Sequence, residues 1–469
     1  MSTFTGALVP VGLHLQGRPV GCRRFRHFRA TPGRDGERCI GRPVIQISNL
    51  ARRRWILAVL VPVIVGAAVV AGFALRGSSS GASVEFVLGA GTGDSGSGPQ
   101  RKVPGELQSM TTDEHGNVAL FTLDSQGYEL WTADPGGAVE RVRVPALDRF
   151  GTGASDQAVQ AAAAPDGSLY LALDAAGLWK VTRDGRATRI VATAREHPLT
   201  DRTPAERLPP LSVNGVAVAD DGTVFFSDRQ NQRNSLLVHR LISGRATVIA
   251  GTPLRAAQEP PKKDPNLLDP KTGAPAEETY IPEDGNAPLA WNGGDLYVHT
   301  GRGILRIATA TERVYPVVGS RDTGALKRPE APFKPFGKAI NGYVDAPRAG
   351  DAEHASSIAV ERATGDLYYG AGDPLPGSGT TGISAKFRWS GDLTKSQLDF
   401  RGSLRNAQQT VYQVGRNGDL SAVTAGAEAL STGNGYLYLA VDTCPSTEAK
   451  CGIANDRSAV IRLRLPTGK

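Results

Sequence analysis

The sequence has few of the residues on which many catalytic and metal sites depend. It contains only 4 Cys and 7 His among 469 residues. It has no phosphate-binding G-x-x-x-x-G-K segment, no H-E-x-x-H zinc motif and no set of kinase catalytic motifs. These absences argue against a P-loop nucleotidase, a zincin-type protease and a kinase, and the sequence predicts no cofactor.

Two glycine-rich matches overlap between Gly91 and Gly96, and neither fits its usual context. The first satisfies G-x-G-x-x-G, but Ser97-Gly-Pro99 follows it. No helix N-terminus is therefore expected there to hold a pyrophosphate. The second, Gly93-Asp-Ser-Gly96, resembles the nucleophile segment of serine proteases, but that family places His and Asp earlier in the chain. Both are interpreted as chance matches.

The basic charge is confined to one end of the chain. Residues 1–54 contain eleven Arg, no Lys and two acidic residues, whereas the whole chain has a formal net charge of +7. The remainder is therefore slightly acidic, and no nucleic-acid partner is expected for it. The low apolar periodicity of residues 1–54 predicts a disordered basic tail beside anionic lipid headgroups.

Residues 55–75 form an apolar run of 21 residues without a charge. A helix of this length spans roughly 31 Å, which matches the hydrocarbon core of a bilayer. Arg52, Arg53 and Arg54 precede it, so the positive-inside rule predicts a single-pass anchor with a cytoplasmic N-terminus and an extracellular remainder. A cleaved signal peptide is the alternative, although its apolar region is usually shorter. Residues 76–83 are interpreted as a linker.

Residues 211–252 contain a repeating unit of four short strands. Asp221-Gly222 separates the first two strands, and the second ends at Asp228. Asp-Gly between apolar runs is a strong hairpin signal, because both central residues of such a turn adopt positive φ. One four-stranded sheet cannot bury both faces, so it needs copies beside it. The unit recurs, with turn glycines at 116, 167, 222, 294, 365 and 435.

Six such units predict an all-β, six-bladed β-propeller over residues 84–469. Each turn is followed by a second strand and then by a third, outgoing strand, namely YELWTA, GLWKVT, SLLVHR, GILRIAT, ISAKFRW and AVIRLRL. The sixth unit has no fourth strand after Leu465. Residues 84–88 are expected to supply it, which would close the ring and remove free strand edges.

The units resemble NHL repeats, which have an apolar strand, Asp-Gly, an aromatic strand ending in Asp, a polar loop and an Ala-Gly-Thr-Gly ending. Residues 214–252 match this pattern best, and unit four has Thr300 where the family has Asp. Similar propellers form the outer part of some actinobacterial receptor kinases. The resemblance therefore implies a membrane-anchored, actinobacterial-type extracellular propeller, and it specifies fold more strongly than function.

The long insertions follow second strands or link successive units, and these connections share one face of a propeller. They comprise residues 195–210, 253–282, 321–345, 373–382 and 443–457. Loops on one face of a rigid scaffold often carry binding sites, although neutral loop growth is the alternative. Within the last insertion, Cys444 and Cys451 are expected to form a local disulfide, with two free thiols as the alternative.

Polar side chains near these connections are candidates for a binding face at the mouth of the central channel. They are Asp228, Arg229, Asn231, Asp284, His299, Asp351, Glu353 and His354. They could bind a polar ligand or a cation. The alternative for Asp124, Asp174, Asp228 and Asp442 is that each caps its own turn.

These features predict a binding, sensing or scaffold module whose insertion-bearing face takes a peptide, glycan or protein ligand, and not an enzyme. The alternative is a propeller enzyme, because similar propellers include lactonases and lyases with a metal on the channel axis. A purely structural role in the cell envelope also remains open.

Overall fold

A computed structural model describes residues 84–89, 91, 94–150, 158–193, 212–230, 235–252, 268–282, 287–300, 303–319, 333–341, 357–372, 387–389, 409–425, 427, 429–445 and 457–466. The expected tail, apolar segment and linker (1–54, 55–75 and 76–83) lie outside these ranges. Within the ranges, no helix has the length and apolarity needed to cross a membrane. All the described residues belong to one unit, residues 80–469.

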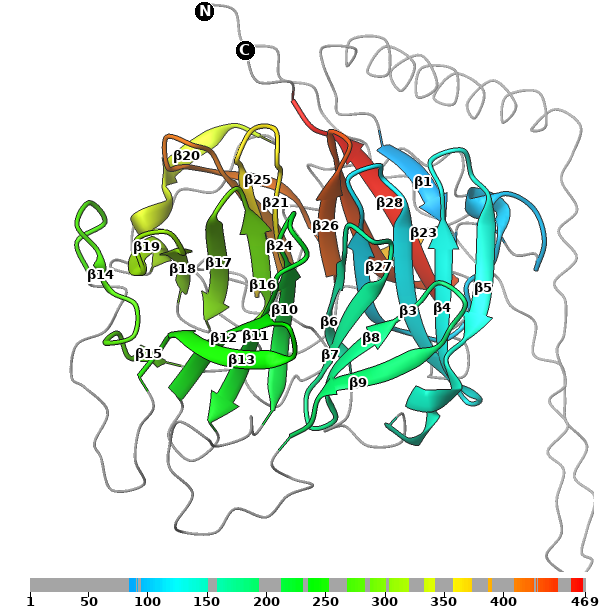
Figure 1. Ribbon diagram of the computed structural model, residues 1–469. Coiled ribbons are helices and arrows are strands. Elements are labelled where there is room, and N and C mark those ends of the chain that lie inside the picture. Colours follow the sequence, from blue (N-terminus) through cyan, green and yellow to red (C-terminus); the bar gives the residue numbers. More distant parts are fainter. Residues whose placement is uncertain are drawn as a thin grey trace, which may run out of the picture. The chain divides into compact units, whose positions relative to one another are not determined.

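This unit consists of six sheets, each built on a blade of four antiparallel strands that are neighbours in space (Figure 1). Blade one contains β2 (Glu106–Thr112), β3 (Val118–Asp124), β4 (Gly127–Ala133) and β5 (Val139–Arg143). Blade two contains β6 (Ala158–Ala163), β7 (Leu169–Leu173), β8 (Gly177–Val181) and β9 (Ala187–Val191). Blade three contains β10 (Val213–Val218), β11 (Val224–Gln230), β12 (Ser235–Ile242) and β13 (Arg245–Ala250).

The other three blades repeat this order with additions. Blade four contains β16 (Leu289–Asn292), β17 (Asp295–Thr300), β18 (Gly303–Ala308) and β19 (Arg313–Gly319). Blade five contains β21 (Ile358–Val360), β22 (Leu367–Gly372), β24 (Gln409–Val414) and β25 (Asp419–Ala425). Blade six contains β26 (Ala429–Gly433), β27 (Tyr436–Pro445), β28 (Arg457–Arg464) and β1 (Val84–Leu88). The short additions are β14 (Ala274–Pro275), β15 (Ile281–Pro282), β20 (Pro335–Lys338), β23 (Phe387–Trp389), and the 3₁₀ helices η1 (Gly98–Gln100), η2 (Pro145–Phe150) and η6 (Ala339–Asn341).

The blades form a closed ring. The first strand of each blade contacts the first strand of the next, in the order β2, β6, β10, β16, β21, β26 and back to β2. Among the described residues, each junction between neighbouring blades has its own apolar core. At the junction of blades one and two, for example, Phe121 and Tyr128 pack with Leu171 and Trp179. The six-bladed propeller is thus confirmed, and burial between blades is what stabilises it.

The predicted ring closure is also confirmed. β1 is antiparallel to β28, with Val84 opposite Leu463 and Leu88 opposite Val460. Leu88 is fully buried and belongs to the core between blades six and one. The first described strand therefore completes the last blade, so this sheet has no exposed outer edge along β28.

Unit five departs from the prediction. Its third strand is β24 and not the segment ISAKFRW, because β24 pairs with β22 and then with β25. Phe387–Trp389 of the predicted strand instead lies parallel to the end of β27. The reason is local: Asn417-Gly418 joins β24 and β25 in a tight hairpin, and Gly418 has φ +77°.

The turn between the first and second strands recurs at the predicted glycines, all of which have positive φ. A single residue, the glycine, has positive φ in the turns of blades one, two, three and five, so the expectation of two such residues is wrong there. In the turns of blades one, two and three the glycine N–H donates to a carbonyl three residues earlier, as Gly222 does to Ala219 at 2.9 Å. We call the face that carries these turns the turn face, and the opposite face the insertion face. Strand alternation puts both ends of each long connection on the insertion face.

Candidate functional site

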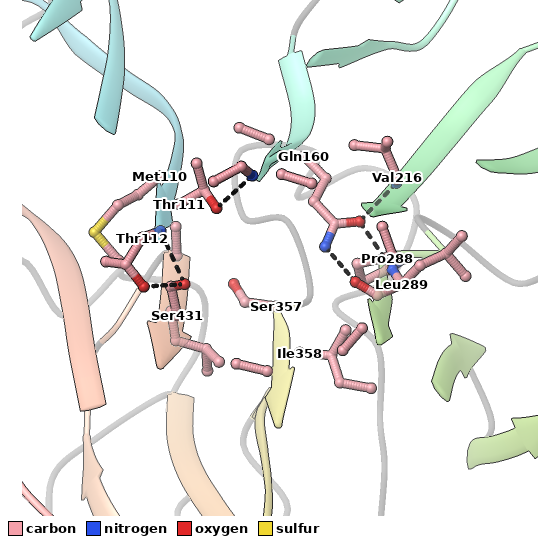
Figure 2. Close-up of a pocket in the computed structure, with 18 of the residues that line it drawn as sticks. Met110, Thr111, Thr112, Gln160, Val216, Pro288, Leu289, Ser357, Ile358 and Ser431 are labelled. Carbon is pink, nitrogen blue, oxygen red and sulfur yellow. Dashed lines mark hydrogen bonds between the residues drawn. The ribbon is translucent and has the colours of Figure 1, made fainter. Parts of the chain in front are cut away.

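The six innermost strands surround a central channel with a cavity of about 120 Å³ (Figure 2). Its lining comes from all six blades and consists of aliphatic, hydroxyl and amide side chains, with Met110, Trp291 and Arg362 as exceptions. Arg362 is the one charged residue in this lining among the described residues. Apart from Arg362, the described channel wall is therefore an uncharged surface with many hydrogen-bonding groups.

Gln160 of β6 links three blades inside the channel. Its Oε1 accepts hydrogen bonds from the N–H groups of Val216 at 2.9 Å and Leu289 at 2.8 Å. Its Nε2 donates to the carbonyl of Leu289 at 2.6 Å. Figure 2 shows the side chain reaching from its strand to both neighbours. An amide nitrogen has two N–H donors, so this arrangement fixes the group and leaves one donor toward the channel.

Hydroxyl groups link blades one, five and six in the same way. Thr112 and Ser431 share a hydrogen bond of 2.7 Å between their hydroxyl oxygens, and the N–H of Thr112 donates to Ser431 Oγ (Figure 2). Thr432 Oγ1 donates to the carbonyl of Val360 at 2.8 Å. Thr111 Oγ1 accepts the N–H of Ala163 at 3.2 Å, which leaves its own O–H free to donate.

Gln108 has an acceptor that no described residue satisfies. It is the extra residue of a β-bulge, because Leu107 is opposite Thr122 while Ser109 is opposite Phe121. Its side chain lines the cavity, is 8% exposed, and its Oε1 has no hydrogen-bond partner among the described residues. A buried acceptor without a partner destabilises the fold by about 1–3 kcal/mol, so this atom is ready to accept a donor from a ligand.

Asp228 and Arg229, two of the residues predicted from the sequence, lie in the last part of β11, near the insertion face. Asp228 is 2% exposed, and its Oδ2 lies 3.6 Å from Nε2 of His239, whose ring stacks on Phe226. Its Oδ1 accepts a hydrogen bond of 3.4 Å from the N–H of Ser212, the residue just before β10. Neither Asp228 nor Arg229 lines the cavity. The turn-capping alternative fits Asp124, whose Oδ1 accepts the N–H groups of Gln126 and Gly127.

His299 lies inside the junction of blades four and five. It is fully buried, its ring is 6.3 Å from that of Tyr369, and neither ring nitrogen has a hydrogen bond to a described residue. Burial lowers the pKa of His299 to about 4, and the nearby backbone of Gly370 offsets this only in part. The side chain of His299 therefore does not lie at the channel mouth, where the sequence predicted it. His299 is also absent from the residues that line the cavity.

The remaining candidates lie outside the described residues. They are Asn231, Asp284, Asp351, Glu353 and His354. Cys451 also lies outside, so the expected disulfide with Cys444 stays a prediction. The described part of the chain brings together no group of three or more His, Cys, Asp or Glu side chains that could hold a metal. The described cavity lining therefore does not fit a metal on the channel axis.

Sequence reasoning missed Gln108, Gln160 and Arg362. Gln160 had a signal, because it is a lone amide in the small apolar strand VQAAAA. Arg362 lies two residues after the first strand of its blade, as Glu114 and Asp220 do, but its distance from the turn glycine differs, so the sequence did not align it with them. Gln108 had none, because the bulge that turns it into the channel follows from register and not from residue type.

No protein-family model matches this chain, and no curated protein matches it in sequence. Solved structures share the fold at low similarity. A gluconolactonase from Xanthomonas campestris is 12% identical, with a TM-score of 0.40 over 82% of this chain and 90% of that one. A virginiamycin B lyase from Staphylococcus aureus is 10% identical, with a TM-score of 0.37 over 77% and 95%. Regucalcin from Agrobacterium tumefaciens, a calcium-binding protein, is 9% identical, with a TM-score of 0.40 over 78% and 93%.

Proposed function

We propose that this propeller is a binding module that takes a small, uncharged, hydrogen-bonding ligand, such as the end of a glycan, into its central channel. The observation that carries the proposal is the lining of the cavity. It offers an unpartnered acceptor at Gln108, a spare N–H at Gln160 and a spare O–H at Thr111. A site without carboxylates or imidazoles matches hydroxyl groups better than it matches ions.

The test is calorimetric titration of the full chain with D-glucose, D-glucuronate and D-glucosamine, which share the pyranose ring and differ mainly in charge. We expect saturable binding of the neutral sugar and weaker binding of the other two. Replacement of Gln108 by Met removes an acceptor that makes no bond in the free protein. It should therefore raise stability by about 1–3 kcal/mol, because a buried unpaired acceptor is removed. It should also weaken binding about 10-fold, the value of one good hydrogen bond.

Gln126→Met is the matched control, because Gln126 is exposed in the β3–β4 turn and away from the channel. If no neutral compound binds, or if Gln108→Met and Gln126→Met bind alike, the channel is not this kind of site.

A second candidate function is catalysis. The gluconolactonase and the lyase named above agree with this alternative better than with a sensing role, although the likeness reaches the fold alone. Its cation ligands would have to include Asp284, Asp351, Glu353 or His354. Incubation of the full chain with glucono-δ-lactone, with and without added Ca²⁺ or Mg²⁺, separates the two functions: metal-dependent hydrolysis supports the enzyme, and binding of glucose without hydrolysis supports the module.

We further propose that residues 55–75 anchor the chain in a membrane, with the propeller outside the cell. The support is the length of the apolar run and the arginines before it. Full-length chain in the membrane fraction, with the propeller accessible to protease added to whole cells, is the expected result. A mature N-terminus near residue 75 or 83 would instead show a cleaved signal.

A further inference from the structure

Three charged side chains from three different blades meet at the turn-face end of the channel. Arg362 of blade five places its Nη1 2.8 Å from Oδ1 of Asp220, which is in blade three. The same nitrogen is 3.4 Å from Oε2 of Glu114 in blade one. Blades one, three and five alternate around the ring. A guanidinium that reaches two of them from the third must lie across the channel mouth, and Arg362 indeed lines the cavity.

The turns that carry these three side chains are held by their own hydrogen bonds. In blade one, the carboxylate of Asp113 accepts the N–H groups of His115 and Asn117. In blade three, Gly222 N–H donates to the carbonyl of Ala219 at 2.9 Å. In blade five, Gly365 N–H donates to the carbonyl of Glu361 at 2.7 Å. Because the backbone is fixed, the part that can move is the long side chain of Arg362.

The bridge is weak enough to open. The side chains of Arg362, Glu114 and Asp220 are 47%, 58% and 62% exposed. Ion pairs this exposed contribute little individually, and salt screens them. One guanidinium between two carboxylates also leaves an excess of negative charge, which disfavours a bound anion at Arg362. The arrangement suits a closure better than an anion site.

We propose that Arg362 is a salt-sensitive closure of the turn-face end of the channel. While the bridge is intact, the channel is a pocket that exchanges its contents through the insertion face. When the bridge is screened or removed, the channel opens at both ends. This inference concerns access and holds whatever molecule the channel takes.

The experiment measures the rate at which single cysteines in the channel react with methyl methanethiosulfonate, a small neutral thiol reagent. Ala162→Cys places the probe next to the last residue of β6, at the turn-face end, and Ala429→Cys places it at the first residue of β26, at the insertion-face end. Each is made in the full chain, alone and with Arg362→Ala. Peptide mass spectrometry distinguishes these probes from the native cysteines.

We expect Arg362→Ala to speed labelling of the Ala162→Cys probe about fivefold or more in low salt, and to leave the Ala429→Cys probe unchanged. Raising NaCl to about 1 M, where the Debye length is about 3 Å, should speed the parent towards the same rate. The pair Glu114→Gln with Asp220→Asn should open the mouth as well, with the arginine retained.

Arg183→Ala is the matched control, because Arg183 lies on the same face and approaches Asp113 at 3.7 Å without lining the channel. Equal labelling of the Ala162→Cys probe with and without Arg362, or no response of the parent to salt, overturns the proposal. Equal acceleration at both probes also overturns it, because that result means general loosening of the ring.

Discussion

Acid should weaken the junction of blades four and five through His299. This side chain is fully buried, and burial lowers its pKa from 6.5 to about 4. The unfolded chain therefore takes up a proton near pH 6.5, while the folded chain stays neutral until about pH 4. Stability attributable to this residue is constant above the unfolded pKa and falls as the pH drops through this window. The loss should be about 2 kcal/mol at pH 5 and approach about 3 kcal/mol near pH 4.

Urea unfolding of the full chain, followed by tryptophan fluorescence between pH 7.5 and 5, measures this loss. His299→Gln cannot take up the proton, so its stability should fall by about 2 kcal/mol less than that of the parent over the same range. His115 and His239 are present in both proteins, and their effects cancel in the comparison. Parallel pH profiles of the two proteins would contradict this role of His299. Titration of the His299 imidazole near pH 6.5 in the folded parent, measured by NMR without any variant, would contradict it as well.

The remaining predictions concern stability and are measured by the same denaturation at neutral pH. Leu88→Ala should destabilise the fold by about 2–5 kcal/mol, because Leu88 is fully buried where β1 closes the ring. Ile242→Ala is its control, since Ile242 is 52% exposed, and a similar loss in both would contradict the closure role. Arg141→Ala should cost about 3 kcal/mol or more, because it leaves the carboxylate of Glu129, whose side chain is 2% exposed, buried without its partner. Glu129→Gln should destabilise the fold less, since Arg141 keeps access to solvent and to the face of Trp131. A larger loss of stability in Glu129→Gln than in Arg141→Ala would contradict this explanation.

The propeller was readable from the sequence because its strongest signals are local. A turn glycine and its flanking apolar runs recur within each unit, and Gly222 or Gly435 identifies a hairpin without reference to the rest of the chain. The third strand of unit five was not readable. The connection between β22 and β24 is long, and the apolar segment ISAKFRW comes before β24 in the sequence. It was therefore predicted as the third strand.

The channel was less predictable, because its chemistry depends on which residues of different blades meet. Gln160 bonds to Val216 and Leu289, and nothing in the spacing of these residues in the sequence indicates that contact. The sequence favoured charged residues near the insertion face, but Asp228 and His299 are buried within or between blades. Charge is easy to see in a sequence, whereas a site built from amides, hydroxyls and backbone groups resembles ordinary strand composition.

The pairing of β1 with β28 has a consequence for how the chain folds during synthesis. β1 leaves the ribosome before any blade is made, but its partner β28 is the last propeller strand to be translated. Contacts between the two ends of a chain form slowly, because the intervening loop must first be ordered. The ring can therefore close only after β28 has been translated. Until then β1 and the edge of blade six are open to pairing with other chains, so nascent or truncated forms that lack residues 457–464 should be the species most prone to aggregate.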